Sequence, residues 1–452
     1  MPTTARKLMP PEDLAVTAEA TEAACLLDSG VLYGRRLLLR GATGDPVFAG
    51  FKPGAFSVYF GDAPVMHFDR EGRWQRAFVD GVHYLKALDT TVQAIDRVRE
   101  GENMVLKRRT LDAPEATALD ATVTSLAVDL IDALDSGRNE KVGPTGKGRP
   151  IDPADLRAFL EQIARWDAAA WADHRERHRA AYGRLPFLPP DCPNPVVLQA
   201  TLGHRGGRAF GGAASEPLRV RTPAEFRTHA REVAALLGRR VEQGKAVFLA
   251  GPDVLRRPTE DIAAYLSTVA EVFPIDPAPG HRRPNAAEDA PHRLDGVHAF
   301  LDDVSPPLPD RDGWRRLRAL GLVRVGLGVG SGDPAVRAAL GTTWTNDAMR
   351  EAVCALKAAG VGVGVSLLVG AGGHEGSGRH VEGTAELVNA LELGPGDLVA
   401  LLDAREMGGP GEPLTDPAWA AQRDALKAGL APVRQTRGAK VVSYSLEKQG
   451  LS

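Results

Sequence analysis

Apolar positions follow two different patterns along the chain, and the change between them falls near residue 196. Before that point, short strand-like runs at 34–40 and 57–60 are interrupted by Gly and Pro. Two later segments carry apolar residues at helical spacing, and the second of them stops at Gly137. The apolar faces of these two expected helices are Leu88, Val92, Ile95 and Val98, and then Leu126, Leu130, Ile131 and Leu134.

The segment between the two patterns is predicted to be a linker followed by a long helix. Residues 137–150 carry four Gly and two Pro and have no apolar periodicity, which is typical of a linker. Asp152 is a suitable N-cap with Pro153 at the first helical position, and the basic residues at 174–179 suit the negative end of a helix dipole. A Pro-rich run at 184–195 then leads into the second pattern.

From residue 196 onward, strand-like runs alternate with helical patterns. The expected strands lie at 196–202, 247–250, 297–301, 323–328, 361–369 and 398–402. The expected helices lie at 226–241, 259–272, 313–320, 346–359 and 378–391. This alternation predicts an α/β fold with a parallel sheet, and six strands favour a partial (β/α)6 TIM-like barrel over an eight-stranded one. The predicted division is an N-terminal α+β domain at 1–136, a linker and long helix at 137–195, the barrel at 196–407, and a C-terminal helix-strand extension at 408–452.

Composition narrows the class of protein without identifying a function. The 452 residues are 43% hydrophobic and 25% charged, which excludes collagenous, mostly disordered and disulfide-scaffold proteins. The net charge of −3 gives no electrostatic reason to expect a nucleic-acid or anionic-membrane partner. The three cysteines, Cys25, Cys192 and Cys354, form no CxxC pair and fit a reducing compartment. With no apolar leader or bilayer-length apolar run, we expect a cytoplasmic protein.

In a barrel of this kind, ligands bind at the C-terminal ends of the strands, so the loops after each strand hold the candidate site. The loop at 203–214 contains five Gly in twelve residues, while 251–253 and 370–375 follow the second and fifth strands. Glycines alternate along the fourth strand at Gly326, Gly328, Gly330 and Gly332. Because side chains on a strand alternate between its faces, one face of this strand is bare. Either a flat ligand lies along that face, or the bare wall makes room for bulky neighbours.

Four segments between 196 and 407 resemble, in order, motifs of the radical S-adenosylmethionine superfamily, in its branch with a (β/α)6 barrel. The family reads TxGCxxNRCTFC after the first strand, and residues 201–212 align with it without a gap as TLGHRGGRAFGG. The run VFLAGPDVLRRPTEDI resembles the family's FLADGDAL-type segment. VRVGLGVGSGDPAV resembles the IGLESGDDEVL motif that lines the cofactor. SLLVGAGGHEGSGRHVEGTAELVNAL resembles the late LLGLGGxExSxxHxxxTAxLLN segment, and the first 190 residues lie outside the resemblance.

The chain departs from the family at the residues that would hold the iron–sulfur cluster. The three family cysteines, spaced C-x4-C-x2-C, fall on His204, Ala209 and Gly212. Ala and Gly have no side-chain ligand, and one imidazole does not replace three thiolates. The glutamate of the family's ESG motif, which contacts the amino acid part of the cofactor, is Gly330 here. The resemblance therefore leaves S-adenosylmethionine open as a cofactor, while the 4Fe–4S cluster is expected to be absent.

Several residues at the strand ends remain candidates for contact with a ligand. This candidate set is Asp253, Gly328, Gly330, Ser331, Gly332, Gly372 and Gly373. Ser331 and Gly332 offer a hydroxyl and backbone N–H groups to a carboxylate or ribose, and Asp253 binds a ligand hydroxyl or stabilises its turn. His374 and Glu375 lie near the same end, but no base–nucleophile pair is defined by spacing, so surface roles are favoured for them.

The leading hypothesis is a non-catalytic, radical-SAM-like pseudoenzyme that binds a small molecule or acts as a scaffold. The partner would then be a small molecule or a protein such as an active paralogue, and neither nucleic acid nor membrane is expected. The alternative hypothesis is an enzyme, either a radical enzyme with an unusual cluster ligand set or a barrel repurposed for cluster-free chemistry.

Overall fold

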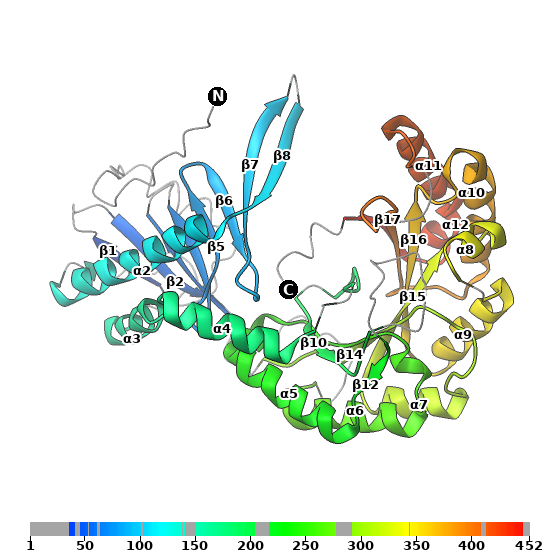
Figure 1. The fold of residues 1–452 in the computed structure, drawn as a ribbon, viewed down its shortest axis with the longest axis horizontal. Helices are drawn as coiled ribbons and strands as arrows, with labels where there is room; N and C mark the ends of the chain where they lie inside the picture. The colour runs from blue at the N-terminus through cyan, green and yellow to red at the C-terminus, as the bar shows by residue number, and fades with distance from the viewer. Residues whose placement is uncertain are drawn as a thin grey trace.

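The fold contains two large sheets of different kinds, joined through helices (Figure 1). The computed structural model of the chain describes residues 36–40, 46–52, 54–60, 64–100, 103–137, 139–140, 151–183, 185, 187–192, 194–203, 217–276, 292–342, 344–407 and 413–445. The first sheet has nine strands and the second has seven, and a two-stranded ribbon accompanies the second. No helix within these ranges is both long and apolar enough to cross a bilayer.

The first sheet is antiparallel, and its first eight strands form a meander in which each strand pairs with the next along the chain. Its strands are β1 (Arg36–Arg40), β2 (Pro46–Lys52), β3 (Ala55–Tyr59), β4 (Val65–Asp69), β5 (Trp74–Val79), β6 (Val82–Lys86), β7 (Val92–Glu100), β8 (Asn103–Thr110) and β9 (Asn139–Glu140). The last strand, β9, pairs with β1. Three helices follow the meander, α2 (Ala113–Asp135), α3 (Pro153–Ala164) and α4 (Ala168–Ala181).

Helices and sheet share one apolar core in this half. Alternate residues of the strands, such as Phe56 and Phe68, pack against apolar residues of α2 and α3, among them Leu156 and Phe159. The 23-residue helix α2 starts at a capping box in which Asp112 and Glu115 satisfy each other's backbone N–H groups. Burial of these side chains on one face of the meander is the main stabilising contribution here.

The second sheet is parallel throughout, and its strands are linked by helices. Its strands, in order across the sheet, are β10 (Val196–Gln199), β13 (Val247–Ala250), β14 (Val297–Leu301), β15 (Leu322–Gly330), β16 (Gly362–Val369), β17 (Leu398–Asp403) and β18 (Lys440–Tyr444). The helices and short 3₁₀ turns are α5 (Pro223–Leu237), η2 (Gly238–Gln243), η3 (Val254–Arg256), α6 (Thr259–Val272), α7 (Arg311–Ala319), α8 (Pro334–Ala339), α9 (Asn346–Ala358), α10 (Gly373–Ala390), α11 (Asp416–Gly429) and α12 (Ala431–Gln435). The ribbon is β11 (Thr201–Leu202) with β12 (Arg219–Val220).

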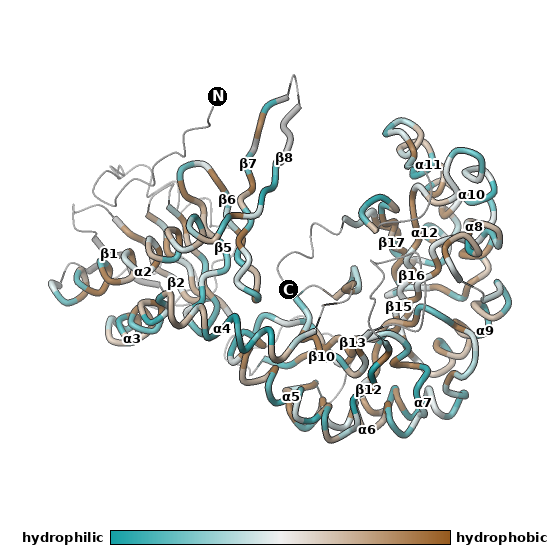
Figure 2. The backbone as a smooth tube through the Cα atoms, viewed as in Figure 1, coloured by the Kyte–Doolittle hydropathy of each residue, from teal (hydrophilic) through white to brown (hydrophobic). Residues whose placement is uncertain are grey.

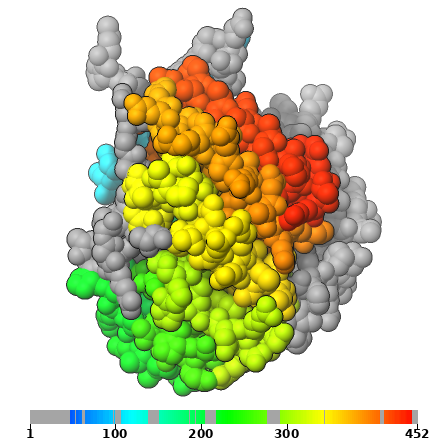
Figure 3. Space-filling model, turned by 90° about the vertical axis from the view of Figure 1, so that its right-hand side faces the viewer, coloured from blue at the N-terminus to red at the C-terminus, as the bar shows by residue number. Residues whose placement is uncertain are grey.

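These helices cover one side of the parallel sheet, which curves with its concave face turned away from them (Figure 1). The space-filling view shows the helical layer following the chain from α5 to α12 around the outside (Figure 3). The strands are the most consistently hydrophobic segments of this half, while the helices alternate in hydropathy as they turn (Figure 2). Side chains such as Val325, Leu327 and Val365 point toward the helices and are fully buried there.

The structure confirms the strand–helix alternation after residue 196. It also corrects three of the expectations drawn from the sequence. The six expected strands are present, but β18 adds a seventh, and the described strands form an open row from β10 to β18 with no closed barrel. The helix expected from Leu88 is wrong, because this segment forms β7 within the meander. Leu88 and Val92 are four positions apart, and an even separation also fits one face of a strand. In the structure, Val92 and Ala94 are buried residues of β7. The long helix after Asp152 is broken at Arg165–Asp167 into α3 and α4.

A buried ion pair joins the two halves. Asp69 and Arg73 are both almost fully buried, and the carboxylate accepts a hydrogen bond of 2.7 Å from Arg73 Nε. The two remaining guanidinium nitrogens of Arg73 donate to the carbonyl oxygens of Leu236 (2.7 Å) and Leu237 (2.6 Å). These carbonyls are at the C-terminal end of α5, where a helix leaves acceptors unpaired and its dipole is negative. One side chain from the meander therefore caps a helix of the parallel sheet.

Substitution of Arg73→Met is expected to destabilise the protein by about 3–5 kcal/mol, because it leaves Asp69 charged and buried and removes the cap of α5. The free energy of unfolding in urea measures this effect. Arg76→Met, at an exposed position of strand β5, which begins directly after Arg73, is the control and is expected to change stability by less than about 0.5 kcal/mol. Equal effects of the two substitutions would contradict the proposed role of Arg73.

Candidate functional site

The candidate residues lie along the C-terminal edge of the parallel sheet, but they do not converge on one point. Asp253 follows β13 in a left-handed backbone conformation with φ 56°. Its carboxylate accepts a hydrogen bond from Arg256 Nη1 (3.2 Å), and the same nitrogen donates to Asp303 after β14 (3.0 Å). Arg256 therefore links the loops that follow two adjacent strands, and Asp253 stabilises this edge.

At the end of β15, the Gly-Ser-Gly segment packs against α10. Ser331 is fully buried, and its hydroxyl lies 2.8 Å from Nδ1 of His380. The N–H of Gly332 donates to the Thr384 hydroxyl (2.9 Å). A Cβ atom at Gly332 would lie 2.1 Å from the carbonyl oxygen of Gly383, so only glycine permits this close approach. The polar groups expected to meet a ligand are used to attach the strand end to the helix.

The remaining glycines of the candidate set have local backbone roles. Gly330 has φ 65° at an irregularity in the pairing of β15 with β16. Gly372 and Gly373 have φ of 80° and 58° where α10 begins. His374 and Glu375, which come next, are exposed. The expected cluster-loop positions His204, Ala209 and Gly212 lie outside the described residues.

Bulky side chains cover the bare face of β15. A Cβ atom at Gly326 would lie 2.6 Å from the Phe300 ring, and one at Gly328 would lie 3.3 Å from it. Phe300 comes from the neighbouring strand β14 and meets the ring of Phe187 edge to face, with 5.7 Å between ring centroids. Of the two interpretations of the alternating glycines, the geometry therefore favours a wall kept bare for its neighbours.

Phe187 belongs to a segment at 187–192, called the strap here, which lies on the concave face of the sheet. Its Asp191 carboxylate lies 2.8 Å from Nε of Arg324 on β15. Arg324 also donates to the carbonyl oxygens of Val363 (3.1 Å) and Gly396. A Cβ atom at Gly364 would be 3.7 Å from the Asp191 carboxylate, so this glycine lies beneath the strap. The Pro-rich run expected to lead into the first strand thus crosses β14, β15 and β16.

His298 of β14 lies beside the Asp191–Arg324 pair and is only 4% exposed. Its Nδ1 lies 4.0 Å from the Asp191 carboxylate, too far for a hydrogen bond. Burial, with smaller contributions from Arg324 and Lys245, lowers the pKa of His298 to about 3. The imidazole is therefore neutral at physiological pH, and among the described residues the charged partner of Asp191 is Arg324.

The described cysteines do not fit a 4Fe–4S cluster. Cys192 lies in the strap and is 1% exposed, and burial, reinforced by the neighbouring Asp191, raises the pKa of its thiol to about 12. Cys354 lies on α9, in the outer helical layer. Cluster ligation needs thiolates brought together, and within the described ranges no group of three His, Cys, Asp or Glu side chains is arranged to hold a metal.

Sequence reasoning missed the residues that organise the concave face. Arg324 and Asp191 are 133 positions apart by number, so no local pattern links them. The signals that existed were the charged Arg324 within an otherwise apolar strand and the glycines Gly362 and Gly364 on the next strand. Both are features of a wall that another segment approaches closely.

No protein-family model matches the chain, and no curated protein matches it. Among solved structures, it is similar to Streptococcus suis SuiB bound to S-adenosylmethionine, with 11% identity and a TM-score of 0.37, over 81% of this chain and 72% of that one. SuiB bound to precursor peptide SuiA gives 12% identity and a TM-score of 0.35, over 81% and 73%. The cobalamin-dependent S-adenosylmethionine radical enzyme OxsB gives 9% identity and a TM-score of 0.31, over 82% and 64%. Because these TM-scores are below 0.5, the functional argument depends on the residues of this chain.

Gly326→Ala is expected to destabilise the protein by about 1–3 kcal/mol, because the new methyl group would overlap the Phe300 ring. Gly364→Ala, at the paired position on β16, is the matched control and should be tolerated, since its Cβ would make only ordinary contacts. Unfolding in urea measures both, and Phe300→Leu completes a double-mutant cycle with Gly326→Ala. A coupling energy near zero would contradict the packing described here.

The free energy of unfolding is expected to fall as the pH drops from about 6.5 toward 3. The folded pKa of His298 is about 3, whereas the unfolded imidazole titrates near 6.5, so only the unfolded chain takes up a proton in this range. At pH 5 this proton uptake lowers the free energy of unfolding by about 2 kcal/mol. His298→Gln should reduce the change in the free energy of unfolding between pH 7.5 and pH 5 by the same amount. His374→Gln, at an exposed position, is the control. An unchanged pH dependence in His298→Gln would show that the imidazole is charged in the folded protein.

Proposed function

We propose that this protein is a radical-SAM-like pseudoenzyme that lacks the 4Fe–4S cluster and acts as a scaffold for a protein partner. The observation that carries the proposal is the chemistry of the sequence 201–212, where His204, Ala209 and Gly212 align with the family's three cluster cysteines. Without thiolates at these positions there is no cluster to supply the electron for reductive cleavage of S-adenosylmethionine.

The packing of the concave face supports the same proposal. A catalytic barrel needs an open chamber at its centre for cofactor and substrate, whereas here Phe187 and Asp191 of the strap lie against the strands. Phe300 fills the space over Gly326 and Gly328. Chain segments therefore take up much of the surface that a flat ligand would need.

The polar groups at the C-terminal edge favour a scaffold over a small-molecule site. Asp253 is bonded to Arg256, and Ser331 and Gly332 are bonded to residues of α10. A ligand at this edge would have to break these internal hydrogen bonds and leave buried groups unpaired, which costs about 1–3 kcal/mol for each group. A protein partner can instead bind the exposed surface without disturbing them.

Anaerobic reconstitution with ferrous iron and sulfide, followed by iron and sulfide analysis, tests the proposal. The wild-type chain is expected to retain no stoichiometric iron, because it lacks the thiolates. The triple variant His204→Cys, Ala209→Cys, Gly212→Cys restores the C-x4-C-x2-C spacing and is the matched comparison. It is expected to gain iron together with absorbance near ~400 nm.

About four irons per wild-type chain would contradict the proposal and indicate an active radical enzyme with unusual ligands. Calorimetric titration with S-adenosylmethionine distinguishes a protein scaffold from a pseudoenzyme that still binds a small molecule. The scaffold predicts no saturable binding, whereas saturable binding to the iron-free chain would indicate a pseudoenzyme that retains a nucleotide site.

A further inference from the structure

The parallel sheet has two edges, because its described strands run in a row from β10 to β18. On an edge strand, every second residue directs its backbone N–H and C=O groups away from the sheet. The two edge strands differ in exposure, since all four residues of β10 are buried and none of the five residues of β18 is. The bonding of the outward backbone groups shows which of these edges can accept another strand.

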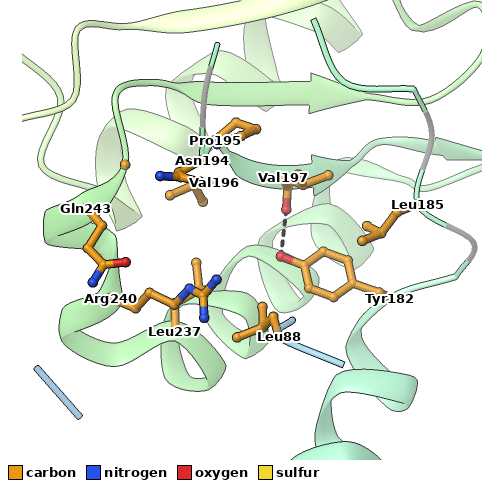
Figure 4. A pocket seen from close by; sticks show the side chains of 11 residues that line it. Leu88, Tyr182, Leu185, Asn194, Pro195, Val196, Val197, Leu237, Arg240 and Gln243 are labelled. Carbon is orange, nitrogen blue, oxygen red and sulfur yellow. Dashed lines mark hydrogen bonds between the residues drawn. The ribbon is translucent and has the colours of Figure 1, made fainter. Parts of the chain in front are cut away.

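At the β10 edge, side chains of the same chain bond the outward groups. The backbone groups of Val197 and Gln199 point away from β13. The carbonyl oxygen of Val197 accepts a hydrogen bond from the Tyr182 hydroxyl (3.0 Å), which Figure 4 shows beside a small cavity at the start of β10. The N–H of Gln199 donates to Nε2 of His229 (2.9 Å), and its carbonyl oxygen accepts a hydrogen bond from Arg221 (2.6 Å). Side chains therefore occupy this edge.

At the β18 edge, the outward groups belong to Val441 and Ser443. Lys440 donates its N–H to the carbonyl oxygen of Asp397 and is paired with Leu398 of β17. Because backbone groups alternate in direction along a strand, the residues of β18 that point away from β17 are Val441 and Ser443. Within the described ranges, no hydrogen bond is made by the outward backbone groups of these two residues, and Ser443 is exposed. This edge can accept another strand.

The outward groups of β18 are arranged symmetrically about Val442. If two copies of β18 run antiparallel around a two-fold axis at Val442, then Val441 of each copy lies opposite Ser443 of the other, and each such pair exchanges two N–H···O=C hydrogen bonds. An axis one residue earlier would bring Ser443 opposite Ala439, whose N–H already donates within its own chain. An axis one residue later would bring Val441 opposite Ser445, beyond the end of β18. The backbone therefore favours one register, centred on Val442.

The side chains along β18 also suit an antiparallel copy of the same strand. Val442 would meet itself at the axis, on the face that it shares with Lys440 and Tyr444. Lys440 of each copy would lie opposite Tyr444 of the other, where an ammonium group can contact the ring. Beyond Tyr444, Ser445 donates to the carboxylate of Glu406 (2.8 Å), and a carboxylate can accept several hydrogen bonds. Antiparallel pairing thus brings the cationic start of one strand to the anionic end of the other.

We propose that β18 is a dimerisation edge, at which a second copy of this chain adds its own β18 in the antiparallel direction. The two parallel sheets then form one continuous sheet across the two-fold axis, and the open edge of each copy is paired. A short strand gives a modest interface, so the dissociation constant is expected in the micromolar range. This proposal is independent of the scaffold function, because it makes no use of residues 201–212.

Sedimentation velocity over chain concentrations from about 1 to 100 µM tests the proposal, because this range brackets a micromolar dissociation constant. The wild-type chain should change from monomer to dimer as its concentration rises. Val442→Lys places two ammonium groups opposite each other at the axis and should weaken dimerisation by at least about tenfold. Val442→Asp should have the same effect. An equimolar mixture of the two variants should dimerise again, because opposite charges then meet at the axis.

Val128→Lys, at an exposed valine on α2, is the matched control and should dimerise like the wild-type chain. Val442 is only partly buried, so its variants should fold, and their melting temperatures check this. A wild-type chain that stays monomeric over the whole range would overturn the proposal and leave the edge to a strand from a different protein. A dimer that persists in both Val442→Lys and Val442→Asp would also overturn it, because its interface would lie elsewhere.

Val442→Cys provides a second test, which reports the register. Residue 442 of each copy would lie opposite its counterpart within disulfide distance, so mild oxidation with diamide should give a covalent dimer. Ser443→Cys lies opposite Val441 and is the matched control, which should stay non-covalent, as should the wild-type chain with its own three cysteines. Equal cross-linking of the two cysteine variants would contradict the proposed pairing.

Discussion

The ion pair between Arg324 and Asp191 is the interaction on which the concave face of the parallel sheet depends. Arg324 is a single side chain on β15, yet it bonds the strap through Asp191, the neighbouring strand through Val363, and the loop before β17 through Gly396. A partly buried guanidinium bonded to a carboxylate and two carbonyl oxygens resists replacement by water, because each freed acceptor would have to be resolvated. Arg324 therefore holds the strap on the concave face of the sheet, while helices cover the opposite face.

The composition of the sheet follows from this arrangement. The ring of Phe300 on the neighbouring strand leaves little room for side chains at Gly326 and Gly328, while Gly364 lies beneath the strap with only ordinary contacts around it. The opposite face of the sheet carries large apolar side chains instead, and Val325, Leu327 and Val365 pack there against helices. In sequence, a glycine-rich strand of this kind resembles a strand that lines a ligand site. Here the groups that contact the bare face are the Phe300 ring and the strap of the same chain.

The local elements could be predicted from sequence far better than the contacts between them. The helix expected at 259–272 matches α6 because its apolar spacing and acidic first turn are both local signals. The segment after Leu88 was misassigned, since an i, i+4 apolar spacing is also compatible with a strand whose alternate residues are buried. The strap and its ion pair could not be predicted, because Asp191 and Arg324 meet only after the sheet has formed. At the candidate site, sequence placed the ends of β13 and β17 closely, but it ended the first strand at 202 and the fourth at 328 where the structure has Gln199 and Gly330, and it could not reveal that Ser331 bonds His380.

The central claim is that the strap stays closed over the concave face in the folded protein, and the reactivity of Cys192 tests it most directly. Cys192 is in the strap, with a buried thiol, whereas Cys354 on α9 is partly exposed. Brief alkylation of the native protein, followed by peptide mass spectrometry, measures the labelling of each thiol separately. A closed strap predicts that Cys354 is labelled while Cys192 reacts only after unfolding. Labelling of Cys192 in the native protein as rapidly as Cys354 would mean that the strap leaves the sheet, and would contradict this account.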